Sequence, residues 1–404
     1  MAKHRKVYRF RMRPTKEQAH ALGRMAGARR WVWNWALRRW KEHYAATGKS
    51  IPMAQLSAEL TALKQQPETA WLRGADSQAL QQAIADLHRA FTNFFEKRAR
   101  YPKFKSRKRD KARFRIPQRV KIRDGRVYVP GVSNAKIGDT KLGDIRIFQS
   151  QEVTEATKGA TFKRAADGKW YVSLVVEFEM PDIPIPAPDP AATVGIDVGL
   201  IDYATFSAPT VQPIPAPKFF RKGQRRLRRA QRTVSRRKRG SKRRAKAAIK
   251  AAAVHRRFAD QRRDFQHKLS TKIVGQYAAV CVETLSLKGL ARTKLAKSFN
   301  DAAFGEFFRQ LKYKCLWNCK HFIAIDRFFP SSTMCNACGA LNDRLTLSDR
   351  EWDCDCGTRH RRDFLAACNI KDEGLRMLAA GQVGEPKRSG RQCKTRHAGQ
   401  LSSN

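Results

Sequence analysis

Two short apolar runs, one near the middle of the chain and one in its second half, each end on an acid, and no other feature constrains the fold as strongly. Residues 194–197 read Val-Gly-Ile-Asp, and residues 279–283 read Ala-Val-Cys-Val-Glu. Runs of this length and composition predict buried β-strands. Asp197 and Glu283 are therefore expected where a rigid strand opens onto a loop.

A third acid, Asp363, follows a group of cysteines in residues 361–367, which read Arg-Arg-Asp-Phe-Leu-Ala-Ala. Three acids brought together repel one another unless divalent cations neutralise them, which is how a two-metal site for cleaving phosphodiesters is built. The alternative is that each acid only forms a turn or caps a helix. Asp202 and Asp326 also flank apolar runs, so the surroundings of each acid must decide.

The charge of the chain indicates its partner. There are 83 lysines and arginines against 35 acids, a formal net charge of +48 over 404 residues. Self-repulsion at this charge destabilises a compact state, so we expect a polyanion to neutralise it. Nucleic acid is favoured over an anionic membrane, since the sequence has no apolar run of about 18 residues and no signal-peptide pattern. The nine cysteines, an odd number, indicate a reducing cytoplasm rather than a disulfide framework.

Four of the cysteines are spaced as metal ligands. Cys335 and Cys338 form a Cys-x-x-Cys pair, and Cys354 and Cys356 form a shorter Cys-x-Cys pair. Four thiolates suit one tetrahedral, structural Zn²⁺ ion. Buried thiols or a redox pair are the alternatives. The other cysteines are interpreted as core residues on one helix (Cys315, Cys319) or as solitary (Cys281, Cys368, Cys393).

A very basic stretch, residues 218–274, lies between the first two acids, and its alanine-rich part predicts helix. It is either a solvated surface helix, a disordered arm or a phosphate-binding element. We favour phosphate contact, which positions nucleic acid without reading its sequence. The residues predicted to bind nucleic acid are Arg225, Arg228, Arg236, Arg237, Lys238 and Arg239 here, and Lys103 and Lys105 in a basic, aromatic stretch at 101–109.

The first part of the chain predicts a strand followed by helices. Residues 3–13 alternate between apolar and basic, as in a strand with one basic face. Thr15 is placed to cap a helix, with Gln18 three residues later. Further helical stretches are predicted at about 53–65 and 77–98.

Residues 113–180 change to short strands and turns, which fit a small β-barrel or meander. Residues 181–190 contain five prolines and predict a linker. A third lobe is then expected to begin at Ala192.

The order of these parts resembles the TnpB family, the RNA-guided nucleases of insertion sequences that are related to type V CRISPR effectors. The resemblance runs from residue 5 to about 370. The segments that carry it are 8–10 (Tyr-Arg-Phe), 14–18 (Pro-Thr-Lys-Glu-Gln), 30–37 (Arg-Trp-Val-Trp-Asn-Trp-Ala-Leu), 102–106 (Pro-Lys-Phe-Lys-Ser), 195–199 (Gly-Ile-Asp-Val-Gly), 282–285 (Val-Glu-Thr-Leu) and 329–332 (Phe-Pro-Ser-Ser) with Cys335 and Asp363 after it.

The resemblance implies a multidomain α+β fold, with an RNase H-like (RuvC) nuclease domain that carries a zinc ribbon. A β-barrel wedge domain with an inserted helical recognition lobe precedes it. The implied boundaries are 1–13 and 113–190 for the wedge domain, 14–112 for the recognition lobe, 191–329 and 361–404 for the RuvC-like domain and 330–360 for the zinc ribbon.

The resemblance also implies the activity, an RNA-guided, Mg²⁺-dependent DNA endonuclease. Asp197, Glu283 and Asp363 would hold two Mg²⁺ ions, beside the one Zn²⁺ of the ribbon. The implied partners are a guide RNA derived from the transposon end and a double-stranded DNA target, in a cytoplasmic, nucleoid-associated prokaryotic protein without a membrane. An RNA-guided repressor that binds without cutting is the alternative. A strand-transfer transposase is disfavoured, because the tyrosine nucleophile with paired histidines is not recognisable.

Two departures from the family pattern stand out. The family reads Arg-Asp-x-Asn-Ala-Ala, whereas this chain has Leu365 at the asparagine position. If that asparagine supports the Asp363 carboxylate, we expect Leu365 to lower activity. The second departure is the single residue between Cys354 and Cys356.

Overall fold

The computed structural model describes residues 2–137, 140–180, 187–346 and 348–382, which form two compact units. One unit comprises Lys3–Phe178, and the other begins at Glu179. Residues 181–186 of the predicted linker, the solitary Cys393 and the last part of the predicted RuvC-like domain lie outside the described residues. Pro190, the last residue of the predicted linker, starts a short 3-10 helix, η2 (Pro190–Ala192).

The first unit is built on a half-barrel sheet of seven strands in the order β2-β8-β9-β1-β7-β4-β3. Its strands are β1 (Ala2–Arg13), β2 (Arg113–Ile116), β3 (Lys121–Arg123), β4 (Arg126–Tyr128), β7 (Ile145–Phe148), β8 (Thr157–Arg164) and β9 (Trp170–Met180). A separate ribbon pairs β5 (Lys136–Ile137) with β6 (Thr140–Lys141). The predicted strand at 3–13 is confirmed, since Tyr8, Phe10 and Met12 enter the core while Arg9 stays exposed.

Three helices and a 3-10 turn lie between β1 and β2 in the sequence. They are α1 (Lys16–Thr47), α2 (Met53–Leu63), η1 (Pro67–Gly74) and α3 (Ser77–Phe95). The predicted start of α1 is confirmed, because Thr15 and Gln18 cap each other in a reciprocal capping box. The helices share an apolar core around Trp33, Trp40 and Phe91.

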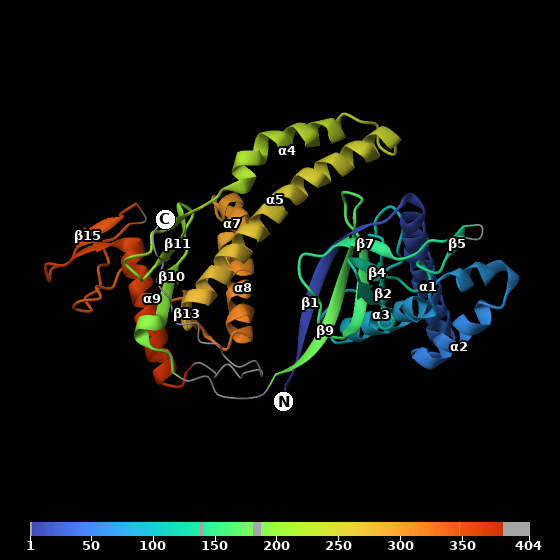
Figure 1. Ribbon diagram of the computed structural model, residues 1–404, viewed down its shortest axis with the longest axis horizontal. Helices are drawn as coiled ribbons and strands as arrows, with labels where there is room; N and C mark the ends of the chain where they lie inside the picture. Colours follow the sequence, from blue (N-terminus) through green and yellow to red (C-terminus); the bar gives the residue numbers. More distant parts are fainter. Residues whose placement is uncertain (1, 138–139, 181–186, 347, 383–404) are drawn as a thin grey trace. The chain divides into compact units, whose positions relative to one another are not determined.

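The second unit contains a five-stranded sheet in the order β12-β11-β10-β13-β14 (Figure 1). Its strands are β10 (Thr193–Asp197), β11 (Asp202–Phe206), β12 (Ile214–Pro215), β13 (Ala279–Glu283) and β14 (His321–Ile325). β10, β13 and β14 run parallel, whereas β11 and β12 are antiparallel to their neighbours. Parallel strands buried on both faces read as continuous apolar runs, which is the pattern that the sequence shows.

Helices cover both faces of this sheet. The helices of this unit are α4 (Phe219–Ser235), α5 (Lys242–Gln276), α6 (Leu287–Leu290), α7 (Ala296–Ala302), α8 (Phe304–Trp317) and α9 (Arg362–Ala379). Val194 and Ile196 share a core with residues of α5 and α8, whereas Cys281 packs with Ile370 of α9 on the other face. Figure 1 shows α9 and α8 on opposite sides of the strands.

Gly195 allows α9 to approach the sheet. A β-carbon at this position would lie 2.0 Å from the carbonyl oxygen of Ala367 and 2.7 Å from the amide nitrogen of Lys371, both in α9. Only glycine therefore fits, and the backbone of α9 lies directly on β10. This contact sets the distance between the start of α9 and the end of β10.

The basic stretch predicted at 218–274 folds as two helices, α4 and α5, rather than as one. Residues 236–241 form the turn between them, with Gly240 in a left-handed conformation (φ 84°). Gly223 of α4 packs face to face with Phe258 of α5, since a β-carbon at Gly223 would lie 2.1 Å from that ring. The two helices thus form a tight hairpin, which extends beyond the sheet of its own unit (Figure 1).

The cysteine-containing segment between β14 and α9 forms a small ribbon of two strands, β15 (Glu351–Asp353) and β16 (Arg359–Arg361). β16 continues into α9 without a linker. Cys315 is buried in α8, as expected, whereas Cys319 lies after the end of that helix with φ 57°, because the helix stops at Trp317.

Candidate active site and four-cysteine centre

The three acids singled out from the sequence line one cavity. Asp197 and Glu283 are the last residues of the adjacent parallel strands β10 and β13, in matching register. Asp363 is the second residue of α9. Together they line a cavity of about 1110 Å³ at this end of the sheet.

The acids influence one another electrostatically. Burial raises the pKa of Asp197 to about 7, with further contributions from the negative charges of Asp363 and Glu283. Burial also raises the pKa of Glu283. A site in which carboxylates resist ionisation is one that a divalent cation would stabilise strongly.

Four arginines that the sequence analysis did not assign also line this cavity, and two of them, Arg350 and Arg362, interact with the acids. Arg350 Nη1 lies 3.4 and 3.3 Å from the two carboxylate oxygens of Asp363. Arg362 donates through Nη1 to the carbonyl oxygens of Thr346 (3.0 Å) and Asp349 (3.4 Å). Its positive charge offsets a small part of the rise in the pKa of Asp197. The contact between Arg350 and Asp363 could not be predicted from their spacing in the sequence, because it forms only when β15 and β16 pair.

Asp301 is a further acid that the sequence analysis missed. It is buried at the end of α7, and both of its carboxylate oxygens accept from the backbone nitrogen of Phe220, at 3.0 and 2.9 Å. It also lies 3.8 Å from Arg262 Nη1. Asp301 therefore caps α4 and holds α5 at the same point, so it fixes the base of the hairpin beside the cavity.

The residues predicted to contact phosphates occupy the surface of the hairpin. Residues 219–276 carry twenty-two lysines and arginines and two acids. Arg225 and Arg228 of α4 are exposed, and so are all four basic residues of the turn at 236–239. Arg244 Nη1 donates to the carbonyl oxygens of Val234 and Arg237, both at 3.0 Å, so the turn is held in place.

The two basic residues predicted in the other unit differ in their surroundings. Lys103 is exposed, whereas the Lys105 ammonium lies 3.1 Å from the centre of the Trp33 ring. Burial lowers the pKa of Lys105 to about 8. Lys103 is therefore the better placed of the two to meet a phosphate.

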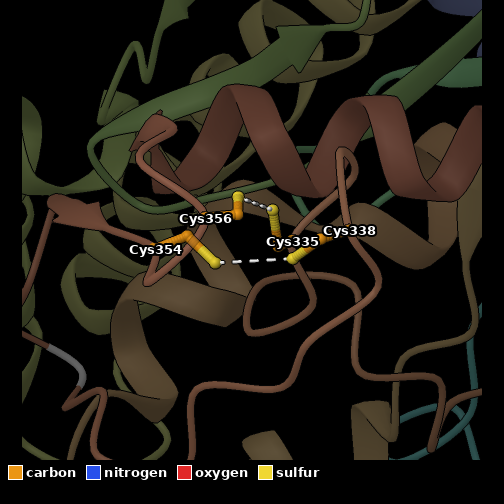
Figure 2. A group of neighbouring side chains, drawn as sticks. All are labelled: Cys335, Cys338, Cys354 and Cys356. Atoms are coloured by element: carbon orange, nitrogen blue, oxygen red, sulfur yellow. Dashed lines mark hydrogen bonds between the residues drawn. The ribbon is translucent and has the colours of Figure 1, made fainter.

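The four cysteines form one compact group. The Sγ atoms of Cys335 and Cys356 are 3.7 Å apart, and those of Cys338 and Cys354 are 3.6 Å apart (Figure 2). All four Sγ atoms lie within 4.8 Å of one another, which holds for no other such group in the described part of the chain. Hydrogen bonds from Thr358 lower the pKa of the Cys356 thiol to about 6. The donor set is suited to a tetrahedral zinc ion.

The short Cys-x-Cys pair still forms a metal-binding turn. Gly357 donates its amide to the Cys354 carbonyl oxygen at 2.8 Å and adopts a left-handed conformation (φ 87°). Gly339 does the same after the first pair, with its amide 2.9 Å from the Cys335 carbonyl oxygen and φ 77°. In both pairs a left-handed glycine closes the turn onto the first cysteine, over five residues in the first pair and four in the second.

Leu365 lies against the cysteine group and not beside the Asp363 carboxylate. It is buried with Cys335, Trp352 and Cys354. Residues two apart on a helix point about 200° apart, so positions 363 and 365 face opposite ways. This packing favours a role for position 365 in the ribbon core, and the effect of Leu365 on activity stays a prediction.

His360 also joins the ribbon to the cysteines. Its Nε2 lies 3.1 Å from Cys335 Sγ, and its ring packs 4.7 Å from that of Trp352. Among the solitary cysteines, Cys281 is buried in the sheet and Cys368 is half-buried on α9. None of the described helices is apolar enough over sufficient length to cross a membrane.

Three family models match the chain. They are "Probable transposase" of the IS605 OrfB type at residues 173–294, "Cas12f1-like, TNB domain" at 304–370 and "Helix-turn-helix domain" of the IS605 OrfB type at 1–49. In the structure the last of these regions is one strand followed by the single helix α1.

Curated relatives and a solved structure extend the match over nearly the whole chain. A "Putative RNA-guided DNA endonuclease" of Streptomyces pristinaespiralis is 39% identical over 95% of this chain and 93% of the relative. A protein of the same description from Escherichia coli K12 is 34% identical over 93% and 94%. The fold resembles the protein in a Cas12f1-sgRNA-target DNA complex, with a TM-score of 0.50 and 16% identity over 88% of this chain and 82% of that one. The chain therefore belongs to the IS605 OrfB/TnpB family.

Proposed function

We propose that this protein is an RNA-guided DNA endonuclease encoded by an insertion sequence. The observation that carries the proposal is the meeting of Asp197, Glu283 and Asp363 in one cavity, from three elements far apart in the sequence. Full-length relatives described as RNA-guided DNA endonucleases support the reaction class. The site we assign to catalysis consists of these three carboxylates.

The same carboxylates would hold two Mg²⁺ ions. Their oxygens are the hard ligands that Mg²⁺ prefers, and their mutual repulsion gives the cavity a strong demand for positive charge. Bound Mg²⁺ would supply an activated water and stabilisation of the leaving 3′ oxygen, leaving 5′-phosphate and 3′-hydroxyl ends. When substrate binds, Arg350 would release Asp363 and bind a phosphate of the substrate at the mouth of the cavity.

Zinc would play a structural part. We assign one Zn²⁺ to Cys335, Cys338, Cys354 and Cys356, which form a closed set of four thiols. Because β16 runs directly into α9, a rigid ribbon would also fix the start of the helix that carries Asp363.

The basic surfaces would hold a guide RNA and a double-stranded DNA target. Base pairing with the guide would supply the sequence specificity, and the protein would contact phosphates along the α4–α5 hairpin. In this assignment, residues 191–329 and 361–404 form an RNase H-like RuvC domain and 330–360 its zinc ribbon. Residues 1–13 and 113–190 form a wedge domain, and 14–112 a recognition lobe. We place the protein in the cytoplasm, associated with the nucleoid.

The test is a cleavage assay on the purified complex of protein and co-purifying RNA. The RNA is sequenced to design a matched target, and Asp197→Ala is compared with wild type in Mg²⁺. Wild type should cut only the matched DNA, while Asp197→Ala should bind it without cutting. Binding without cutting by wild type would favour the RNA-guided repressor instead, and joined strands would indicate a transposase.

A further inference from the structure

A column of aromatic rings runs from the core of the helical part of the first unit to its surface. Trp40 of α1 stacks on Phe91 of α3, with ring centres 4.1 Å apart and an interplanar angle of 9°. Phe95 continues the stack, 6.2 Å from Phe91 at 25°. The first two rings are buried, whereas Phe95 is 59% exposed. Phe95 also contacts Phe94, with ring centres 5.4 Å apart, and more than half of its surface remains accessible.

A second element holds two more rings beside this one. Residues 101–105 follow α3 without regular structure, and Asn34 of α1 pairs with Lys105 in both directions. Its Nδ2 donates to the Lys105 carbonyl oxygen at 2.9 Å, and its Oδ1 accepts from the Lys105 amide at 2.7 Å. Trp33 Nε1 donates to the Lys103 carbonyl oxygen at 3.1 Å. Three hydrogen bonds therefore fasten this segment to α1.

The fastened segment exposes its rings rather than burying them. Tyr101 packs edge-on against Phe94 at 5.2 Å and is 41% exposed, and Phe104 is 44% exposed. The Lys41 ammonium lies 5.7 Å from the Tyr101 ring and 5.2 Å from the Phe104 ring. We call Phe95, Tyr101, Phe104, Lys41 and Lys103 the aromatic–basic patch.

The charge around the patch selects its partner. Residues 96–109 carry eight lysines or arginines and one acid. Exposed rings grouped on a surface mark a binding site, and rings interleaved with cations suit bases and phosphates together. A second copy of this chain would bring the same positive charge to the contact and be repelled. A regular duplex offers phosphates but no free base faces, so it would use the cations and leave the rings idle.

We propose that the aromatic–basic patch binds an unpaired stretch of nucleic acid, with bases stacked on Phe95 and Phe104 and phosphates on Lys41 and Lys103. The proposal rests on the proposed function, because an RNA-guided nuclease handles both unpaired guide RNA and displaced DNA. It adds a site that distinguishes single strands from duplexes, and this site belongs to a different unit of the chain from the carboxylate cavity.

The test uses the full-length protein and a fluorescein-labelled 12-nucleotide single-stranded DNA, with binding followed by anisotropy at several salt concentrations. The variant Phe95→Leu/Phe104→Leu keeps apolar volume at both positions, and circular dichroism checks its fold. Trp71→Leu is the matched control, since Trp71 is an exposed ring of the same helical part that packs on Trp31 and not on the patch. Affinity should fall roughly tenfold or more for the double variant and stay unchanged for the control.

Measurements of salt dependence and of duplex binding separate the contribution of base stacking to affinity from that of charge. The double variant should keep the wild-type slope of log affinity against log salt, whereas Lys41→Gln should reduce it by about 0.7. A 12-base-pair duplex should bind wild type and double variant equally. The fluorescence of a single strand that contains 2-aminopurine should be quenched when wild type binds it, and much less when the double variant binds it.

An unchanged affinity of the double variant for single strands would overturn the proposal, as would an equal loss for the duplex. Sedimentation that finds a wild-type dimer lost in the variant would assign the patch to contacts between copies. Guide-dependent cleavage by wild type is measured in the same preparations. Cleavage together with unchanged single-strand binding would reject the patch alone, whereas absent cleavage would reject the proposed function.

Discussion

The carboxylate cavity and the four-cysteine centre meet at the start of α9, yet they are assembled in opposite ways. The acids come from two strand ends and a helix, and they come together only after the sheet has formed and α9 has packed on it. The thiols come from two tight turns within residues 335–356. Only the thiols have all donor atoms within 4.8 Å of one another among the described residues.

The energetic consequences also differ. Burial and the neighbouring acids raise the pKa of Asp197, so holding these carboxylates in their charged form lowers the stability of the folded state. Metal binding to a closed set of thiols instead contributes free energy of folding. The carboxylate cavity therefore lowers stability and is expected to be kept for function, whereas the four-cysteine centre is expected to be kept for stability. Four substitutions test this contrast.

Glu283→Gln should separate activity from stability most clearly. Cleavage of a guide-matched target should fall at least about 10³-fold, as expected when a catalytic group is lost. The melting temperature should stay the same or rise, because burial already disfavours the charged form of Glu283. Both are measured on the same RNA-loaded preparation.

Asp326→Asn is the matched control for Glu283→Gln. Asp326 follows β14, the next parallel strand, but its Oδ1 accepts from the amide of Phe328 at 2.8 Å as a turn former, and it does not line the cavity. It should retain cleavage. A cleaving Glu283→Gln, or an inactive Asp326→Asn, would break the distinction between the two strand-end acids.

Cys338→Ser should damage the ribbon itself. We expect wild type to carry about one Zn²⁺ per chain, and the variant to bind zinc more weakly by at least about 100-fold. Hydrogen exchange in 330–360 should accelerate, and cleavage should fall because Asp363 loses its support. Cys368→Ser, half-buried outside the group, should keep its zinc. Metal analysis that finds no zinc in wild type purified without chelator would contradict the assignment.

Gly195→Ala should show that the cavity depends on packing. The new β-carbon would meet the α9 backbone at 2.0 Å, so the helix must shift, at a cost of about 1–3 kcal/mol. Cleavage should fall by more than tenfold while zinc is retained, because Asp363 moves with α9. Gly275→Ala, in open space on α5, should be neutral or slightly stabilising. Equal activity of both variants would show that the carboxylate geometry tolerates a displaced α9.

Leu365→Asn should have the smallest effect on cleavage. The amide would enter the apolar group around Cys335, Trp352 and Cys354 and cost about 1–3 kcal/mol in ribbon stability. Cleavage below the melting temperature should stay within about twofold of wild type. A tenfold rise would return position 365 to the support of Asp363.

The sequence predicted best what depends on local pattern. The capping box of Thr15 and Gln18, the basic face of β1 and the strands that end at Asp197 and Glu283 all follow from spacing and polarity within a few residues. The grouping of the four cysteines followed from the chemistry of paired thiols.

What escaped prediction depends on contacts between distant segments. Asp301 accepts from Phe220 of α4, eighty-one residues earlier, and Arg350 meets Asp363 only because the ribbon folds back. The face that Leu365 presents could be read from helical periodicity once the start of α9 was known, but the cysteine group on that side could not. Gly195 stands two residues before Asp197 in the sequence, but its role appears only with α9 in place.

The position of β1 has a consequence for how the chain is made. β1 is made before every other strand of its sheet, in which it is the fourth of seven, and its partners β7 and β9 lie more than 130 residues downstream. At a typical synthesis rate, β1 waits on the order of ten seconds with both edges open. Its arginines at alternate positions repel other unpaired strands during that interval. The basic face of β1 therefore protects the nascent chain from aggregation before it can contribute to any finished surface.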